Sequence, residues 1–195
     1  MVLWTVAILM TVLFLILLAL VFLRKLQFDA IHQNFLELED EFGGRVIRNG
    51  FAVRPRYAGS YKGEEFSISI TSEKTEDERR YYIAVNMQSD SQVSFTIMSK
   101  DWLGKRELSP ERQQESISVN NDAYLLEATN LANLRGMDIP KLENIISMMH
   151  PFAYVLIGKS RMLLERASVN IVQDSKLDAL KPLLEGMYHL KLAMG

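Results

Sequence analysis

The sequence predicts an α+β fold in which one N-terminal transmembrane helix continues into a stalk helix and is followed by an antiparallel sheet packed with helices. Three observations support this prediction. Residues 1–23 form an uncharged apolar run, apolar and polar residues alternate in several short segments between residues 57 and 119, and helical spacing dominates the C-terminal third. The connections between the predicted strands are too short for parallel crossovers, so the sheet is expected to be antiparallel.

Composition limits the classes of function. The chain has 195 residues, enough for one domain, and no cysteine, which excludes disulfides, thiolate catalysis and thiolate zinc sites. Its 22 basic and 24 acidic residues all follow the apolar run and give a net charge of −2. This balance argues against bulk electrostatic binding of nucleic acid, so no nucleic-acid partner is expected.

Residues 1–23 are predicted to be a transmembrane helix. Only Thr5 and Thr11 interrupt the apolar run, and each can bond back to its own helix. A helix over Val2–Leu23 would be about 33 Å long, sufficient for a hydrocarbon core of about 30 Å. No basic residue precedes this long run, so we predict an uncleaved signal anchor in the bilayer, with Trp4 at the interface.

The flanks of the apolar run predict its orientation. Arg24 and Lys25 follow it directly, and no Lys or Arg precedes it. By the positive-inside rule, these two residues mark the cytoplasmic membrane interface. The chain is therefore predicted to be a single-pass protein of the cell membrane with its soluble domain in the cytoplasm.

Residues 24–44 are predicted to form a juxtamembrane stalk helix that ends at Gly43-Gly44. A straight stalk would extend about 28 Å beyond the bilayer. Its apolar residues recur at 3-4-3-4 spacing and therefore share one stripe. The stripe could pack on its own domain, which its three phenylalanines favour, or form a coiled-coil seam in a homo-oligomer. The stripe consists of Phe28, Ile31, Phe35, Leu38 and Phe42.

Residues 45–195 are predicted to form the soluble α+β domain. Asn49-Gly50 and Lys62-Gly63 are turn signals, and residues 100–115 are polar enough to be a long loop. Alternation of apolar and polar residues marks the strands, because one face of such a strand is buried and the other is wet. The predicted strands cover residues 57–61, 64–71, 81–87, 93–98 and 116–119.

The hydrophobic period changes after residue 120. Asn121 or Asp122 could cap a helix that runs to Leu134, with Gly136 after its end. Asp138 and Pro140 would open a second helix, which His150-Pro151 would stop.

The C-terminal segments are predicted to be a hairpin and a helix. The hairpin covers residues 152–157 and 161–167 and turns at Gly158-Lys159. The helix begins at residue 174 or 175 and extends to 194. Pro182 lies inside it and cannot donate a backbone hydrogen bond, so a break near Lys181 is expected.

No motif in the sequence predicts catalysis, a cofactor or a metal. Gly158-Lys159-Ser160 lacks the glycine that a phosphate-binding loop needs five residues earlier, where Ala153 stands. The histidines are in no metal-ligand spacing and are expected to be surface or capping residues. They are His32, His150 and His189.

One cluster of basic residues is a candidate binding site. Arg45, Arg48, Arg54 and Arg56 lie within a short segment, with Phe51 and Tyr57 nearby. Such a cluster could bind an anionic or phosphorylated ligand, although a solvated strand surface explains it more simply. A straight stalk would hold it away from the bilayer, beyond a Debye length of about 8 Å.

A short motif carries a resemblance. Residues Gly59–Phe66 form a G-x-Y-x-G-x-x-F pattern that leads into an alternating strand. With its apolar run and its length, the chain resembles a group of bacterial single-pass membrane-anchored proteins of unknown function. The resemblance implies a prokaryotic single-span protein and brings no activity and no catalytic residues.

These observations favour a membrane-tethered, non-enzymatic interaction or scaffold domain with a protein partner. The alternative is an anion- or phospho-ligand-binding module that uses the Arg45–Arg56 segment. A second alternative is an enzyme of unfamiliar type whose carboxylates come together only in the fold, in a concave pocket that raises their pKa.

Overall fold

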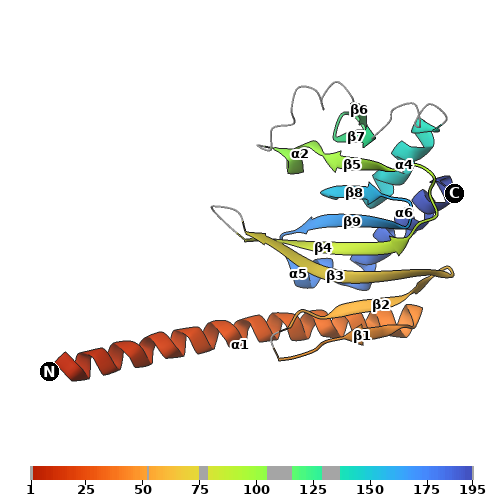
Figure 1. Cartoon of the computed structure of the whole chain (residues 1–195). Coiled ribbons are helices and arrows are strands. Elements are labelled where there is room, and N and C mark those ends of the chain that lie inside the picture. Colours follow the sequence, from red (N-terminus) through yellow and green to blue (C-terminus); the bar gives the residue numbers. More distant parts are fainter. Residues whose placement is uncertain (1, 52, 75–78, 105–115, 129–136, 195) are drawn as a thin grey trace.

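The computed structural model describes residues 2–51, 53–74, 79–104, 116–128 and 137–194. It contains a single nine-stranded sheet with helices packed against it, and this confirms the predicted α+β class (Figure 1). The strand order is β1-β2-β3-β4-β9-β8-β5-β7-β6, and every neighbouring pair is antiparallel. The C-terminal hairpin β8–β9 is therefore inserted between strands that come much earlier in the chain.

Seven strands agree closely with the strands predicted from the sequence, whereas β1 and β7 were not predicted as strands. Short β1 pairs only with β2 and is an edge of the sheet. The strands are β1 (Arg45–Ile47), β2 (Arg56–Tyr61), β3 (Glu64–Lys74), β4 (Arg79–Gln88), β5 (Phe95–Ser99), β6 (Ser116–Val119), β7 (Tyr124–Ala128), β8 (Tyr154–Ile157) and β9 (Arg161–Ser168).

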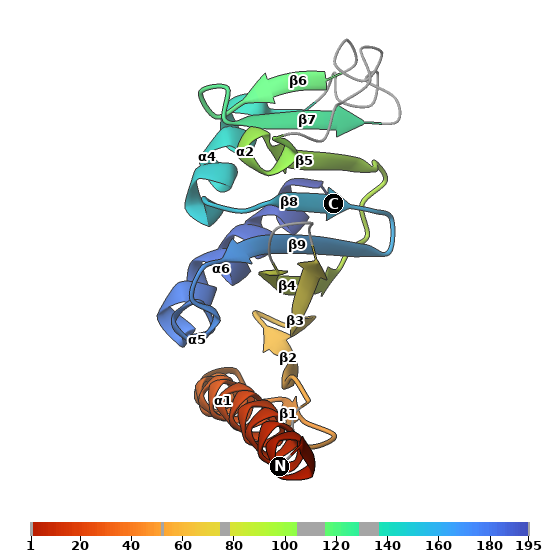
Figure 2. The ribbon, with the colours of Figure 1, turned by 90° about the vertical axis from the view of Figure 1, so that its left-hand side faces the viewer.

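The three C-terminal helices cover one face of the sheet, and the long N-terminal helix follows its lower edge (Figures 1 and 2). At the start of α4, the Asp138 side chain accepts a hydrogen bond from the backbone N–H of Lys141 (3.0 Å), as the sequence predicts for a cap. The helices are α1 (Val2–Phe42), α2 (Lys100–Leu103), α4 (Ile139–Met149), α5 (Ile171–Asp174) and α6 (Leu177–Met194).

Helix α1 is continuous from the apolar run to the domain, as predicted, and its two halves have different surroundings. Residues 2–23 extend away from the domain with their side chains exposed, Trp4 at 76% (Figure 1). The Thr11 hydroxyl donates to the carbonyl of Ala7 (2.9 Å), within the same helix. Within the described residues, α1 is the one helix long and apolar enough to cross a membrane.

The second half of α1 is part of the domain core and does not form a free stalk. Asn34 Nδ2 donates to the carbonyl of Val172 (2.7 Å) and to Ser175 Oγ (2.8 Å), which ties the helix to α5. The predicted stripe lies against β1, β2, α5 and α6, which confirms the prediction that it packs on its own domain. The alternative prediction, that the stripe forms a coiled-coil seam between copies of the chain, is wrong. Its members Phe28, Ile31, Phe35 and Leu38 are buried, and Phe42 packs against the same core.

Residues 124–128 form strand β7, whereas the sequence predicted a helix over 121–134. Asn120, Asn121 and Asp122 all have positive φ (54°, 53° and 68°), so they make the β6–β7 turn rather than a helix cap. In the strand, Tyr124 and Leu126 face the core. Residues 129–136, which include the rest of that predicted helix and Gly136, lie outside the described residues.

Two further local predictions are wrong. Part of the predicted loop 100–115 is the one-turn helix α2, and residues 105–115 lie outside the described residues. Helix α6 does not break near Lys181, because Pro182 and Asp178 both lie on its exposed side. Water can bond the Asp178 carbonyl that the proline leaves without a helical donor.

The G-x-Y-x-G motif has a packing explanation in the structure. A Cβ atom added to Gly59 would lie 2.2 Å from the hydroxyl oxygen of Tyr57, so a side chain at residue 59 would displace that ring. Gly63 has φ +88° in the β2–β3 turn. Both glycines therefore serve the fold.

Candidate interaction sites

The arginines predicted as an anion site are divided by the fold. Arg48 Nη1 donates to Asp29 Oδ1 (2.6 Å) and Arg48 Nη2 donates to the carbonyl of Phe51 (2.8 Å). Arg54 Nη2 donates to Ser72 Oγ (2.6 Å), and its guanidinium lies 5.6 Å from the centre of the Tyr81 ring. Arg48 and Arg54 therefore have structural partners, and neither is an uncommitted cation.

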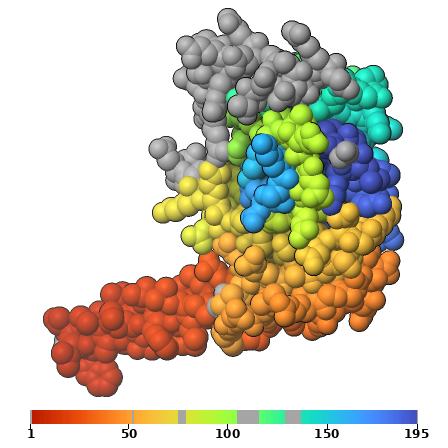
Figure 3. Space-filling model, turned by 45° about the vertical axis from the view of Figure 1, so that its right-hand side comes forward, coloured from red at the N-terminus to blue at the C-terminus, as the bar shows by residue number. Residues whose placement is uncertain are grey.

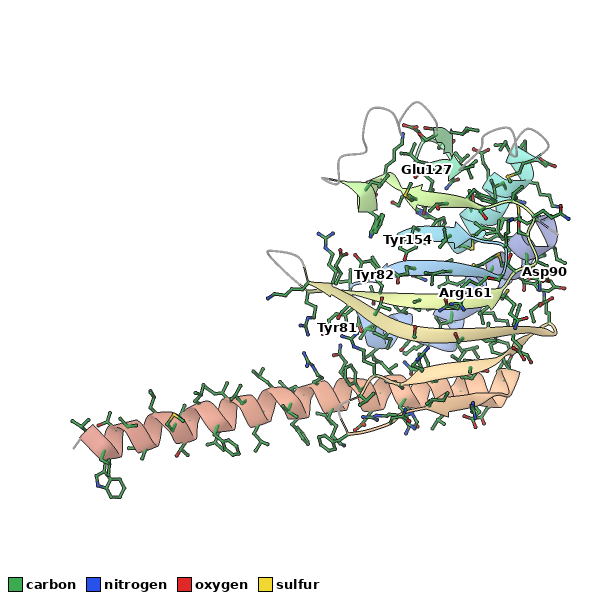
Figure 4. All side chains as sticks on the ribbon, in the orientation of Figure 1. Tyr81, Tyr82, Asp90, Glu127, Tyr154 and Arg161 are labelled. Atoms are coloured by element: carbon green, nitrogen blue, oxygen red, sulfur yellow. The ribbon has the colours of Figure 1, made fainter. Side chains whose placement is uncertain are left out.

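Arg45 and Arg56 are exposed and share one face of β1 and β2, away from that pair. Arg56 and Arg161 line a hollow of about 480 Å³. Figure 4 labels Arg161, which comes from β9. The sequence did not connect this residue with the Arg45–Arg56 segment, because the chain between them is long.

A charged cluster joins the β1–β2 connection to α1 directly after the apolar run. Lys25 Nζ lies 2.7 Å from Asp29 Oδ2, and Arg48 contacts the other oxygen of the same carboxylate. These hydrogen bonds, first from Lys25 and then from Arg48, hold the pKa of Asp29 below its usual value. Lys25 Nζ also lies 5.3 Å from the centre of the Phe51 ring. The connection is therefore held against the helix at the level of the predicted membrane interface.

The other candidate site is a pocket on the sheet face opposite α4 and α6. Its volume is about 420 Å³. Figure 4 labels two of its tyrosines, Tyr82 and Tyr154, on the strands that flank β9. The lining residues are Thr71, Ser72, Glu73, Tyr82, Trp102, Tyr154 and Glu165.

Glu165 of β9 lies at the centre of this pocket. It pairs with Ala84 on one side and Tyr154 on the other, and Thr71 Oγ1 donates to its Oε1 (3.4 Å). Burial raises the pKa of the Glu165 carboxyl above its usual value, although hydrogen bonds from Thr71 and Tyr154 oppose that rise. Burial also raises the pKa of Tyr154 to about 12, so its hydroxyl remains a donor at neutral pH.

Aromatic rings line the same pocket. The Trp102 and Tyr154 ring centres are 5.2 Å apart, and the Tyr82 hydroxyl donates to Glu73 Oε2 (3.2 Å). Aromatic faces and carboxylates together attract cationic groups such as ammonium or guanidinium. The arrangement is thus chemically suited to binding a cation.

This pocket could not be predicted from local sequence pattern, because its residues come from β3, β4, β8, β9 and α2 and meet only in the folded sheet. One signal was available, since alternation along Arg161–Ser168 assigns Glu165 to the face opposite the buried Met162 and Leu164.

Two of the three histidines make hydrogen-bond contacts with neighbouring side chains of the fold. His150 Nδ1 lies 2.8 Å from the Tyr124 hydroxyl, and His189 Nε2 lies 2.8 Å from Glu185 Oε1. Among the described parts of the chain, no three His, Asp or Glu residues gather in a way that could hold a metal ion. The Gly158-Lys159-Ser160 segment is a hairpin turn as predicted, with the Gly158 N–H donating to the Arg161 carbonyl (3.0 Å).

No protein-family model and no curated protein matches this sequence. Among solved structures, the chain is similar to the mycobacterial trehalose monomycolate transport factor A, TtfA. The two share 12% identity with a TM-score of 0.46, and the similarity covers 82% of this chain and 95% of the other. A likeness of this degree establishes neither a common family nor a common activity.

Proposed function

We propose that this chain is a membrane-tethered, non-catalytic interaction domain. The observation that carries the proposal is the division of α1, whose residues 2–23 are apolar and exposed while the following half is buried in the domain core. In water such a helix would expose a long apolar surface, but in a bilayer the same surface is solvated. Because one helix serves as both anchor and core element, the domain is coupled to the membrane without a flexible linker.

The pocket around Glu165 supports the interaction role. Its two carboxylates and three aromatic rings fit a protein partner that presents a lysine or arginine side chain. Leu156, on neighbouring β8, is 43% exposed and extends this surface with apolar area. The partner would then be held by one charged contact within a mixed polar and apolar surface.

We further propose that the protein crosses the cell membrane once and that its domain lies in the cytoplasm. Arg24 and Lys25 support this orientation, since they flank the apolar half on the domain side. Two measurements on native membranes test the anchor and the orientation. The full chain should resist alkaline carbonate extraction, and its domain should survive protease added outside spheroplasts. Extraction would overturn the anchor, and digestion from outside would overturn the orientation.

Position-specific crosslinking tests the binding surface. The chain has no native cysteine, so a photo-crosslinker can be attached at Leu156→Cys without other changes. Leu192→Cys, on the exposed side of α6, is the matched control. A discrete crosslinked product from position 156, absent from position 192, would support the proposal. Equal yields or no product from position 156 would contradict it.

A further inference from the structure

Two apolar side chains in the β1–β2 connection are exposed although Arg48 anchors this connection to α1. Phe51 is 62% exposed and Val53 is 45% exposed. Arg48 fixes the backbone here by donating to the Phe51 carbonyl. Exposed apolar side chains mark an interaction surface when they belong to a contiguous apolar patch.

Phe51 lies beside the apolar half of α1. It closes an apolar groove of about 380 Å³ whose other walls belong to that helix. In Figure 3 the exposed red helix emerges directly beside the orange surface of the β1–β2 region. The lining residues of α1 are Leu15, Leu18, Ala19, Val21 and Phe22.

The groove gives the depth of Phe51 relative to a bilayer. Leu15 and Phe22 are about two helical turns apart, or about 10 Å. If the apolar half of α1 spans the bilayer, these two turns occupy the outer part of the hydrocarbon core on the domain side. The Phe51 ring must then be near this depth, because it lines the same groove as these turns.

Basic residues directly follow the apolar half of α1, next to the groove that Phe51 closes. Arg24 is exposed at the end of the apolar half, and Lys25 lies over the Phe51 ring. Arg48 is on the adjoining connection, where Asp29 is the acidic residue that contacts both Lys25 and Arg48. An apolar tip bordered by cationic groups is the arrangement typical of an interfacial membrane contact, where lipid phosphates lie above the acyl chains.

We infer that the β1–β2 connection is a second membrane contact, in which Phe51 and Val53 enter the interfacial layer and Arg24 and Lys25 face anionic headgroups. This inference depends on the proposed membrane anchor. The sequence predicted that a straight stalk would hold the Arg45–Arg56 segment away from the bilayer. The second half of α1 instead packs along the domain, so the β1–β2 connection lies next to the apolar half of the helix. The domain therefore rests against the membrane surface in a fixed orientation.

Fluorescence quenching in vesicles tests the inference. The full chain, labelled with an environment-sensitive dye at Phe51→Cys, is reconstituted into phosphatidylcholine–phosphatidylglycerol vesicles that contain lipids with a quencher on the acyl chain. The label at position 51 should show blue-shifted emission and lose most of its intensity to the quencher. Leu192→Cys, exposed near the C-terminus on the side of the domain opposite to the apolar half of α1 (Figure 1), is the control that should remain unquenched.

A label at Leu18→Cys separates the inference from the anchor. Position 18 lies in the apolar half of α1 and should be quenched whether or not the domain touches the bilayer. Quenching at position 18 without quenching at 51 would overturn the second contact and leave the anchor standing. No quenching at position 18 would overturn both. A blue shift at position 51 without lipid quenching would indicate a protein neighbour and would also overturn the inference.

Discussion

The Tyr57 hydroxyl donates a hydrogen bond to the carbonyl oxygen of Gly43 over 2.5 Å, and this contact joins β2 to the end of α1. The carbonyl of Leu38 lies 3.2 Å from the same hydroxyl, within the last turn of the helix. Burial raises the pKa of Tyr57 to about 12, so the proton needed for this bond is present throughout the physiological range. The helix end is thus satisfied by a side chain from the sheet.

Tyr57→Phe should lower the free energy of unfolding by about 0.5 to 1.5 kcal/mol, because it removes the hydrogen bond from the buried Tyr57 side chain to the Gly43 carbonyl. Thermal unfolding of the full chain in detergent, followed by circular dichroism, measures the change. Tyr57→Ala should cost more, since it also removes the buried ring. Equal stabilities of wild type and Tyr57→Phe would show that the hydroxyl contributes nothing to the fold.

Truncation should show where the domain begins. A chain that starts at Arg24 retains the whole buried stripe of α1 and should unfold cooperatively in urea. A chain that starts at Gly43 loses Phe28, Ile31, Phe35 and Leu38 from the core. Each loss costs on the order of 2–5 kcal/mol, so the four together cost about 8–20 kcal/mol, which is as large as the about 5–15 kcal/mol stability of a typical domain. Cooperative unfolding of the shorter chain would show that the sheet folds without α1.

The periodic segments of the sequence predict their elements correctly. The two halves of α1 share a run without Gly or Pro, and β3 alternates clearly, so both elements were predicted correctly. The prediction of a helix over residues 124–128 was wrong because the segment YLLEA suits a helix locally. Only its pairing with β5 and β6 makes it a strand. The stripe of α1 was recognised, but its position against β1 and β2 depends on tertiary packing.

Acid should remove one stabilising cluster. Glu185 accepts hydrogen bonds from Lys62 Nζ (2.7 Å) and from the Tyr61 hydroxyl, and these contacts lower the pKa of its carboxyl to about 2. A carboxyl with a lowered pKa in the folded state stabilises the fold above its unfolded value of 4.5. That stabilisation is lost as the pH falls from 4.5 toward about 2.

Glu185→Gln should therefore be less stable than wild type at neutral pH, and the difference should shrink across that acidic window. Urea unfolding of the two chains at a series of pH values measures it. Glu37→Gln, on the exposed side of α1, is the control and should follow the wild-type curve. A constant difference between Glu185→Gln and wild type at all pH values would exclude this carboxylate as the cause.

Glu165→Gln should have the opposite effect on stability. Burial raises the pKa of this carboxyl, so the charged form opposes folding as the pH rises above 4.5. The variant should be more stable than wild type at neutral pH and indistinguishable from it at low pH. It should also reduce crosslinking from Leu156→Cys, because a cationic partner would lose its charge contact. Greater stability with unchanged crosslinking would separate Glu165 from the binding surface.

The two candidate sites differ in how much of each could be predicted from the sequence. Arg45, Arg48, Arg54 and Arg56 were grouped because they are close along the chain, but strand pairing directs them to different partners. The pocket around Glu165 joins residues that are up to 94 positions apart, as Thr71 and Glu165 are. Such a site depends on strand order, and the insertion of β8–β9 between β4 and β5 was not readable from local pattern.

The bond between Asn34 and Val172 has a consequence for biosynthesis. The two residues are 138 positions apart, so the ribosome releases the buried stripe of α1 long before it makes the helix that covers part of it. Strands β1 and β2 emerge soon after the stripe, but the part of it that α5 and α6 cover has no native partner during most of translation, and that apolar surface remains open on the nascent chain. The domain therefore closes late, when α5 and α6 have emerged, and synthesis of the last quarter of the chain decides whether it folds.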